Sequence, residues 1–347
     1  KVHEAKEVVL AALAVLDKPV EGTHEPLRKR LRSEFMLLAR WPGLLREFRT
    51  HYALPMPGRD PQAIAAVARL YEHLGRAAYL LEEMDMQDMA VLRCLNLSLL
   101  LRSRTKLATA NGAAPNAKLR SAYDQLARAY AAACIVDRVA QSPKLNQRFK
   151  RESIALAKQI GNPPSLTLYI HMMFGLAAMN EPDWARAESS LQSAVEASKE
   201  GYSGRRGEEV LHSLGVSLLF SGKVDAAYET FGKARDQCVE RHDLPMLAKL
   251  TVGLCVPLIC RGDYNEAIGL LESTSEPGTV QEYFNSKASN HANACGLLAM
   301  ASYKIGKREV ARRLAEQVGY ASPQCSPGSL KVAPLPPPPP PVILHVF

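Results

Sequence analysis

Several features that would assign a compartment are missing from this sequence. Aromatic residues make up only 6% of the chain, and no unbroken apolar run reaches the length of about 18 residues that a membrane span needs. No positively charged start leads into a short apolar core, which disfavours a secretion signal. We therefore expect no membrane contact. We also expect Lys1, which stands where a start Met would be, to be an internal residue of a longer protein.

Motifs of common catalytic sites are absent as well. The sequence has no Gly-x-x-x-x-Gly-Lys-Ser/Thr phosphate loop, no His-Glu-x-x-His zinc motif and no Gly-x-Ser-x-Gly nucleophile elbow. His171 and His212 lie about one repeat apart, and we interpret them as packed or capping residues. Acidic pairs such as Glu208 and Glu209 are typical of a solvated helix face. The sequence thus predicts no catalytic residue, no metal site and no cofactor.

The seven cysteines do not form a disulfide or zinc pattern. Their number is odd, and the nearest pair, Cys255 and Cys260, has neither a Cys-x-x-Cys spacing nor polar surroundings. Most of them lie among Ala, Leu and Val, where a free Cys packs as a small hydrophobe. We predict a reducing, cytoplasmic environment. A ciliary or axonemal site is a narrower expectation that rests on analogy with other repeat scaffolds.

Internal self-similarity at a spacing of 40 residues is the most informative pattern present. Small residues recur where two helices would touch, large apolar residues recur between them, and glycines recur at the turn. These repeat-packing positions are Gly175, Ala187, Leu191, Gly215, Gly222, Ala227, Phe231, Gly262, Ala267, Leu271, Gly306 and Ala311. We expect a partner helix to cross closely at Gly215, and we expect Phe231 to face the groove between the helices.

This spacing predicts an all-α fold, an α-solenoid of stacked antiparallel helix pairs. Each pair is amphipathic and buries its apolar face only by stacking on its neighbours. The repeat is longer than the roughly 34 residues of a tetratricopeptide (TPR) unit. We divide the chain into a helical connector (1–60), irregular TPR-like pairs (61–165), regular 40-residue repeats (166–320) and a Pro-rich tail (321–347). Within the second segment, residues 117–140 read as one continuous helix.

The formal charge of +8 is unevenly distributed. Basic residues gather between positions 102 and 151, where only Asp124 and Asp137 oppose them. The candidate partner-binding residues of this basic region are Arg102, Arg104, Lys106, Lys118, Arg120, Arg128, Arg148, Lys150 and Arg151. They could attract an acidic protein or a nucleic acid, or form an uncommitted surface. Few aromatic residues interleave with them for base stacking, which disfavours nucleic acid.

The tail carries six successive prolines, Pro336 to Pro341, preceded by Pro334. Such a run adopts an extended polyproline II helix without internal hydrogen bonds. It could dock into the aromatic-lined groove of a polyproline-recognising domain, or it could be a solvated linker. The residues themselves leave both interpretations open.

Several short stretches together resemble the helical-repeat region that follows the ATPase module in large class III adenylate and guanylate cyclases and related multidomain ATPases. The stretches are residues 39–42 (Ala-Arg-Trp-Pro), 70–75 (Leu-Tyr-Glu-His-Leu-Gly), 94–97, 125–130, 154–157, 161–164 (Gly-Asn-Pro-Pro) and 184–187. The likeness extends over roughly residues 25 to 320 at the level of pattern. In that family the cyclase and ATPase modules precede the repeats. The resemblance therefore implies a regulatory or scaffolding region, and it supplies no catalytic residue.

Three functional hypotheses follow from these observations. The first is a non-catalytic TPR-like scaffold or regulatory region that binds protein partners within a larger protein or assembly. The second is the C-terminal regulatory part of an active nucleotide cyclase. The third is nucleic-acid binding through the basic region, which would weaken steeply with added salt.

The repeat alignment predicts that Ala227→Trp disrupts one helix pair. The added indole overpacks a position where two helices touch, and such overpacking costs about 1 to 3 kcal/mol or more. Circular dichroism and thermal melting check this expectation. An unchanged melting midpoint would show that the 40-residue register is wrong.

Overall fold

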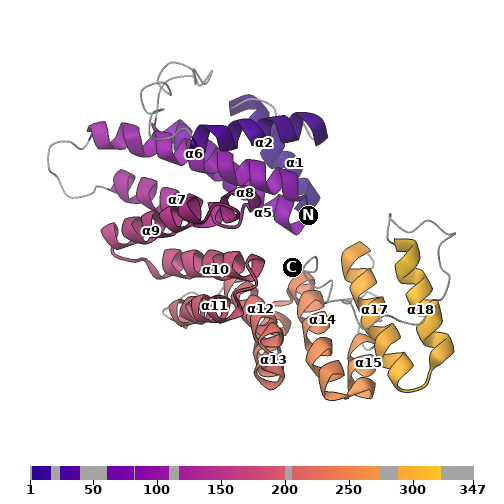
Figure 1. Cartoon of the computed structure of the whole chain (residues 1–347). Coiled ribbons are helices and arrows are strands. Elements are labelled where there is room, and N and C mark those ends of the chain that lie inside the picture. The colour runs from indigo at the N-terminus through magenta and orange to yellow at the C-terminus, as the bar shows by residue number, and fades with distance from the viewer. Residues whose placement is uncertain are drawn as a thin grey trace. The chain divides into compact units, whose positions relative to one another are not determined.

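The computed structural model describes residues 2–16, 24–39, 61–81, 83–108, 117–199, 205–272 and 288–321, and every regular element in these ranges is a helix (Figure 1). This confirms the predicted all-α fold for the described part of the chain. Two compact units are present, Lys1–Tyr202 and Ser203–Phe347. Each is described separately below.

The first unit is a succession of helices in which sequence neighbours pack on one another. Helix α5 packs on α6, α6 on α7, α7 on α9, and α10 on α11. The helices are α1 (Val2–Leu16), α2 (His24–Ala39), α5 (Pro61–Leu80), α6 (Met84–Ala108), α7 (Ala117–Ala133), α8 (Asp137–Ala140), α9 (Pro143–Gln159), α10 (Pro164–Asn180) and α11 (Trp184–Lys199).

The opening helices α1 and α2 pack on later helices of this unit. Helix α1 packs on α5, and α2 packs on α6. Glu34 of α2 is only 3% exposed, and its Oε2 accepts a 2.6 Å hydrogen bond from Asn96 of α6. Arg93 of α6, also buried, donates to Glu34 Oε1 at 3.4 Å. No sequence pattern predicted this contact, because the partners lie about sixty residues apart.

The continuous helix predicted for residues 117–140 is wrong. Helix α7 ends at Ala133, a turn follows, and the short α8 begins at Asp137. The turn is held by Asn146, which is buried and donates from Nδ2 to the carbonyl of Cys134 at 3.4 Å. No Gly or Pro marks the break. The break therefore coincides with a contact from the later helix α9 and carries no local sequence signal.

The second unit consists of helix pairs in which each second helix also packs on the next pair. Helices α12 and α13, α14 and α15, and α17 and α18 form the pairs, while α13 also packs on α14 and α15 on α17 (Figure 1). The helices are α12 (Arg205–Phe220), α13 (Val224–Arg241), α14 (Leu244–Arg261), α15 (Tyr264–Glu272), α17 (Ala288–Lys304) and α18 (Arg308–Ala321).

The turns inside these pairs share one backbone geometry. Gly222, Gly262 and Gly306 all take the left-handed conformation, with φ of 75°, 90° and 85°. After each glycine, the next amide donates to a carbonyl five residues back, as in the bond from Lys223 to Leu218 at 2.9 Å. Glycine adopts this conformation without the steric cost of a Cβ.

The helices of a pair meet where glycine faces a large side chain. A Cβ built on Gly215 of α12 would lie 2.6 Å from the ring of Phe231 on α13, and one built on Gly253 of α14 would lie 2.9 Å from the same ring. Phe231 is fully buried. In the first unit a Cβ on Gly175 would lie 2.5 Å from Leu191. These distances are shorter than a carbon contact allows, so the close approach requires glycine.

Helix α14 is the one described helix that is long and apolar enough to cross a membrane by length and composition. The search for unbroken apolar runs in the sequence did not find this helix, because polar residues interrupt its apolar stretch. The buried share of this helix is 61%, and Leu250, Cys255 and Leu258 lie in the core of the second unit. Core helices are often equally long and apolar, so length and composition alone do not make α14 a membrane span.

We predict opposite stability changes for two glycine-to-alanine substitutions. Gly215→Ala forces a methyl group into the Phe231 ring and should destabilise the second unit by about 1 to 3 kcal/mol. Gly232→Ala, on the neighbouring helix α13, meets nothing within 4 Å. It should stabilise by up to about 1 kcal/mol through helix propensity. Urea unfolding measures both, and equal effects would contradict the packing described above.

Candidate binding site

The described residues show no arrangement suited to metal or thiol chemistry. They contain no group of three or more His, Cys, Asp or Glu side chains that could hold a metal ion. Burial raises the pKa of the Cys94, Cys134, Cys238 and Cys255 thiols to about 12. Since the thiolate is the reactive form, these four side chains are packing residues. Cys260 is exposed.

A buried carboxylate occurs where the sequence suggested a solvated face. Glu208 on α12 is fully buried and forms an ion pair with Arg241 near the end of α13. One turn later on α12, the His212 ring packs against the Phe231 ring, with 5.8 Å between the ring centroids. Burial and the nearby Lys249 lower the pKa of His212 to about 3, so the imidazole is neutral at physiological pH. The expectation that Glu208 is solvated is therefore wrong.

The described side chains of the basic region differ in their surroundings. Arg128 donates to Asp124 at 2.8 Å and lies over the Tyr169 ring. The Lys150 ammonium lies over Phe174 at 5.9 Å, while Arg120 and Arg151 are exposed. Arg148 is half-buried. The side chains of Arg102, Arg104, Lys106 and Lys118, and the Pro-rich tail, lie outside the described residues.

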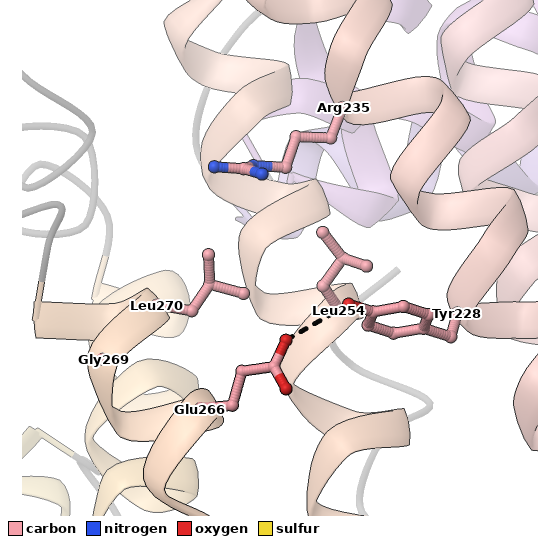
Figure 2. Close-up of a pocket in the computed structure, with 6 residues that line it drawn as sticks. All are labelled: Tyr228, Arg235, Leu254, Glu266, Gly269 and Leu270. Atoms are coloured by element: carbon pink, nitrogen blue, oxygen red, sulfur yellow. Dashed lines mark hydrogen bonds between the residues drawn. The ribbon is translucent and has the colours of Figure 1, made fainter. Parts of the chain in front are cut away.

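A cleft of about 350 Å³ opens between α13, α14 and α15 in the second unit (Figure 2). Tyr228 and Arg235 reach it from α13, and Glu266 reaches it from α15. The Tyr228 hydroxyl lies 3.3 Å from Glu266 Oε1, where it can donate a hydrogen bond. Desolvation raises the pKa of Tyr228 most, and the neighbouring Glu266 carboxylate raises it further. The remaining lining residues are Leu254, Gly269 and Leu270.

None of the residues that line this cleft was a predicted site residue. The predicted positions of α13, Ala227 and Phe231, are fully buried on a neighbouring, packed stripe of the helix. Tyr228 and Arg235 are two helical turns apart and form a second stripe. That spacing was visible in the sequence, but only the tertiary structure brings Glu266 of α15 to Tyr228 and makes this stripe one wall of a cleft.

No protein-family model and no curated protein matches the sequence. Among solved structures, the chain is similar to a Signal Transduction ATPase with Numerous Domains (STAND) protein with a tetratricopeptide repeat sensor from Pyrococcus horikoshii. The identity is 12% and the TM-score 0.50, over 84% of this chain and 40% of that chain. The chain also matches apo RapI, at 12% identity and a TM-score of 0.45, over 85% of this chain and 97% of that one. BtubC from P. vanneervenii matches at 12% identity and a TM-score of 0.36, over 86% of this chain and 91% of that one.

At this level of identity, the STAND protein informs the fold alone. This chain spans 40% of the length of that protein. Together with the stacked pairs of the described residues, the likeness confirms the predicted TPR-like α-solenoid. The resemblance to the repeat regions of nucleotide cyclases stays a prediction.

We predict that His212 makes folding stability pH-dependent. Its folded pKa, about 3, lies below the unfolded value of about 6.5, so the unfolded state binds the extra proton between these values. Stability is therefore fully present above pH 6.5 and falls as the pH decreases. His212→Gln should reduce this loss, measured as the shift in urea midpoint between about pH 7.5 and about pH 5. His73→Gln, at an exposed position, is the control. A wild-type pH dependence in H212Q would contradict this assignment.

Proposed function

We propose that this chain is a non-catalytic TPR-like interaction region that binds a protein partner. The carrying observation is the stacked array of the second unit, in which each helix pair contacts its neighbours and a cleft opens between α13 and α15. An array of this kind presents helix faces and inter-helix clefts along its length, and these surfaces suit docking of a helix or an extended segment.

We further propose that the chain serves a larger signalling protein as its regulatory or scaffolding part. The residue patterns shared with the repeat regions of class III cyclases and related ATPases support this proposal. A STAND protein with the same fold is named as an ATPase with a TPR sensor, and this chain spans 40% of it. An active nucleotide cyclase is one such parent. In that parent the repeats would sense a partner and pass the signal to upstream modules.

The nucleic-acid alternative has less support among the described side chains. Arg128 is engaged by Asp124 and Tyr169, and Lys150 lies over an aromatic ring. These contacts use two of the charges that phosphate binding would need. Binding to RNA or DNA that weakens steeply between low and moderate salt would favour this alternative over a protein partner.

The test is native purification of the endogenous protein, with mass spectrometry of the parent and of its stoichiometric partners. Each co-purified partner is then made recombinantly, and its affinity for the full chain is measured by calorimetry. We expect at least one direct complex with one-to-one stoichiometry. Peptides from an upstream cyclase or ATPase module would identify a regulatory part of an enzyme. Absence of any direct complex would overturn the interaction proposal.

A further inference from the structure

Arg235 provides a cationic group in the cleft that the surrounding side chains leave available. Its Nε atom is buried and has no hydrogen-bond partner, and no described carboxylate forms an ion pair with it. A buried guanidinium N–H without an acceptor costs free energy. The side chain as a whole is half-buried and lines the cleft, where its guanidinium can meet an acceptor. Figure 2 shows the Arg235 side chain extending from α13 toward the side where Leu270 lies.

The other charged groups near the cleft are already engaged. Arg261 forms an ion pair with Asp225 and lies over the Tyr228 ring, 4.6 Å from its centroid. Glu266 pairs with the Tyr228 hydroxyl, yet it is exposed and retains acceptor capacity for a second donor. The cleft therefore offers a cation at Arg235 and an acceptor at Glu266.

One lining residue of the cleft is a glycine, and a second glycine lies nearby on α13. Gly269 lies beside Leu270 on α15, and Gly232 lies on α13 between Tyr228 and Arg235 by helical spacing. A Cβ on either glycine would meet nothing within 4 Å, unlike one on Gly215, so packing does not require glycine there. Glycine inside a helix costs stability relative to alanine. Leu254 and Leu270 are the apolar residues that line the same cleft.

We propose that this cleft binds an acidic residue, Asp or Glu, in an extended segment of a protein partner. The carboxylate pairs with the Arg235 guanidinium, a neighbouring apolar side chain packs on Leu254 and Leu270, and a main-chain N–H of the segment donates to Glu266. A charge-assisted arginine–carboxylate pair is the strong contact of the three. The proposal rests on the proposed function and names the chemistry of the partner.

The cleft fits a carboxylate better than a phosphate group. Phosphate carries close to two negative charges at neutral pH and is usually met by several cations. Here Arg235 is the one cation among the lining residues, and the Glu266 carboxylate lines the same cleft. At about 350 Å³ the cleft accommodates one or two side chains rather than a whole helix.

The experiment follows the side-chain Nε–H resonance of Arg235 by nuclear magnetic resonance in the full chain. The resonance is assigned by its loss in Arg235→Lys. The probe is the blocked dipeptide N-acetyl-Leu-Glu-amide, and N-acetyl-Leu-Gln-amide is its uncharged match. We expect a saturable shift with the Glu dipeptide and at least a tenfold weaker response to the Gln dipeptide. Equal responses to both, or no response to either, would overturn the proposal.

Two variants test whether binding occurs in the cleft itself. Gly269→Leu fills the opening and should abolish the Arg235 shift, whereas Gly296→Leu, at another helix position without neighbours within 4 Å, should retain it. A shift that persists in G269L would place the dipeptide elsewhere. Inorganic phosphate is titrated in parallel, and tighter binding of phosphate than of the Glu dipeptide would overturn the carboxylate assignment.

The same variants separate this proposal from the proposed function. If the dipeptide fails to bind while the purified partner still forms a complex with wild type and Arg235→Gln alike, the cleft assignment is wrong and the interaction function stands. If the dipeptide binds in the cleft but no direct protein complex is found, the proposed function fails. We expect Arg235→Gln to weaken the partner complex at least tenfold.

Discussion

The packing of the second unit depends on how closely its helices approach one another, and the Phe231 ring sets that distance. The ring fits between Gly215 of its own pair and Gly253 of the next pair. One side chain therefore fills the interface within a pair and the interface between pairs. Protein interiors are packed too densely to tolerate an extra carbon at such a point, so both neighbours are glycine. Leu191 has the same relation to Gly175 in the first unit.

Helix α13 shows how one element can serve both packing and binding. Ala227, Phe231, Ala234 and Cys238 form its fully buried stripe. Tyr228 and Arg235 lie on a second stripe that faces α15 across the cleft. The buried stripe holds the helix in place, so the side chains of the cleft are positioned by a rigid scaffold. A site of this kind can discriminate between partners through a few polar groups on an apolar floor.

A buried carboxylate in each unit contacts a basic side chain of another helix. Glu34 of α2 is held by Arg93 and Asn96 of α6, and Glu208 of α12 is held by Arg241 of α13. A buried carboxylate needs a partner, because its desolvation is costly when it is unpaired. Each of these contacts therefore disfavours a slipped arrangement in which the carboxylate would face apolar side chains. They add specificity to a core made largely of Leu, Ala and Val.

The class of the fold and the turn inside each pair could be predicted from the residues alone. Gly215 and Gly222 each have counterparts about 40 residues away, and such spacings reflect helical periods and turns that neighbouring residues encode. The features that join distant residues could not be predicted this way. They are the docking of the opening helices through Glu34, the break after Ala133, the burial of Glu208, and the cleft at Arg235. Periodicity says which face of a helix is apolar. It does not say which distant helix covers that face, because many stackings bury similar apolar area and the choice lies in particular side-chain contacts.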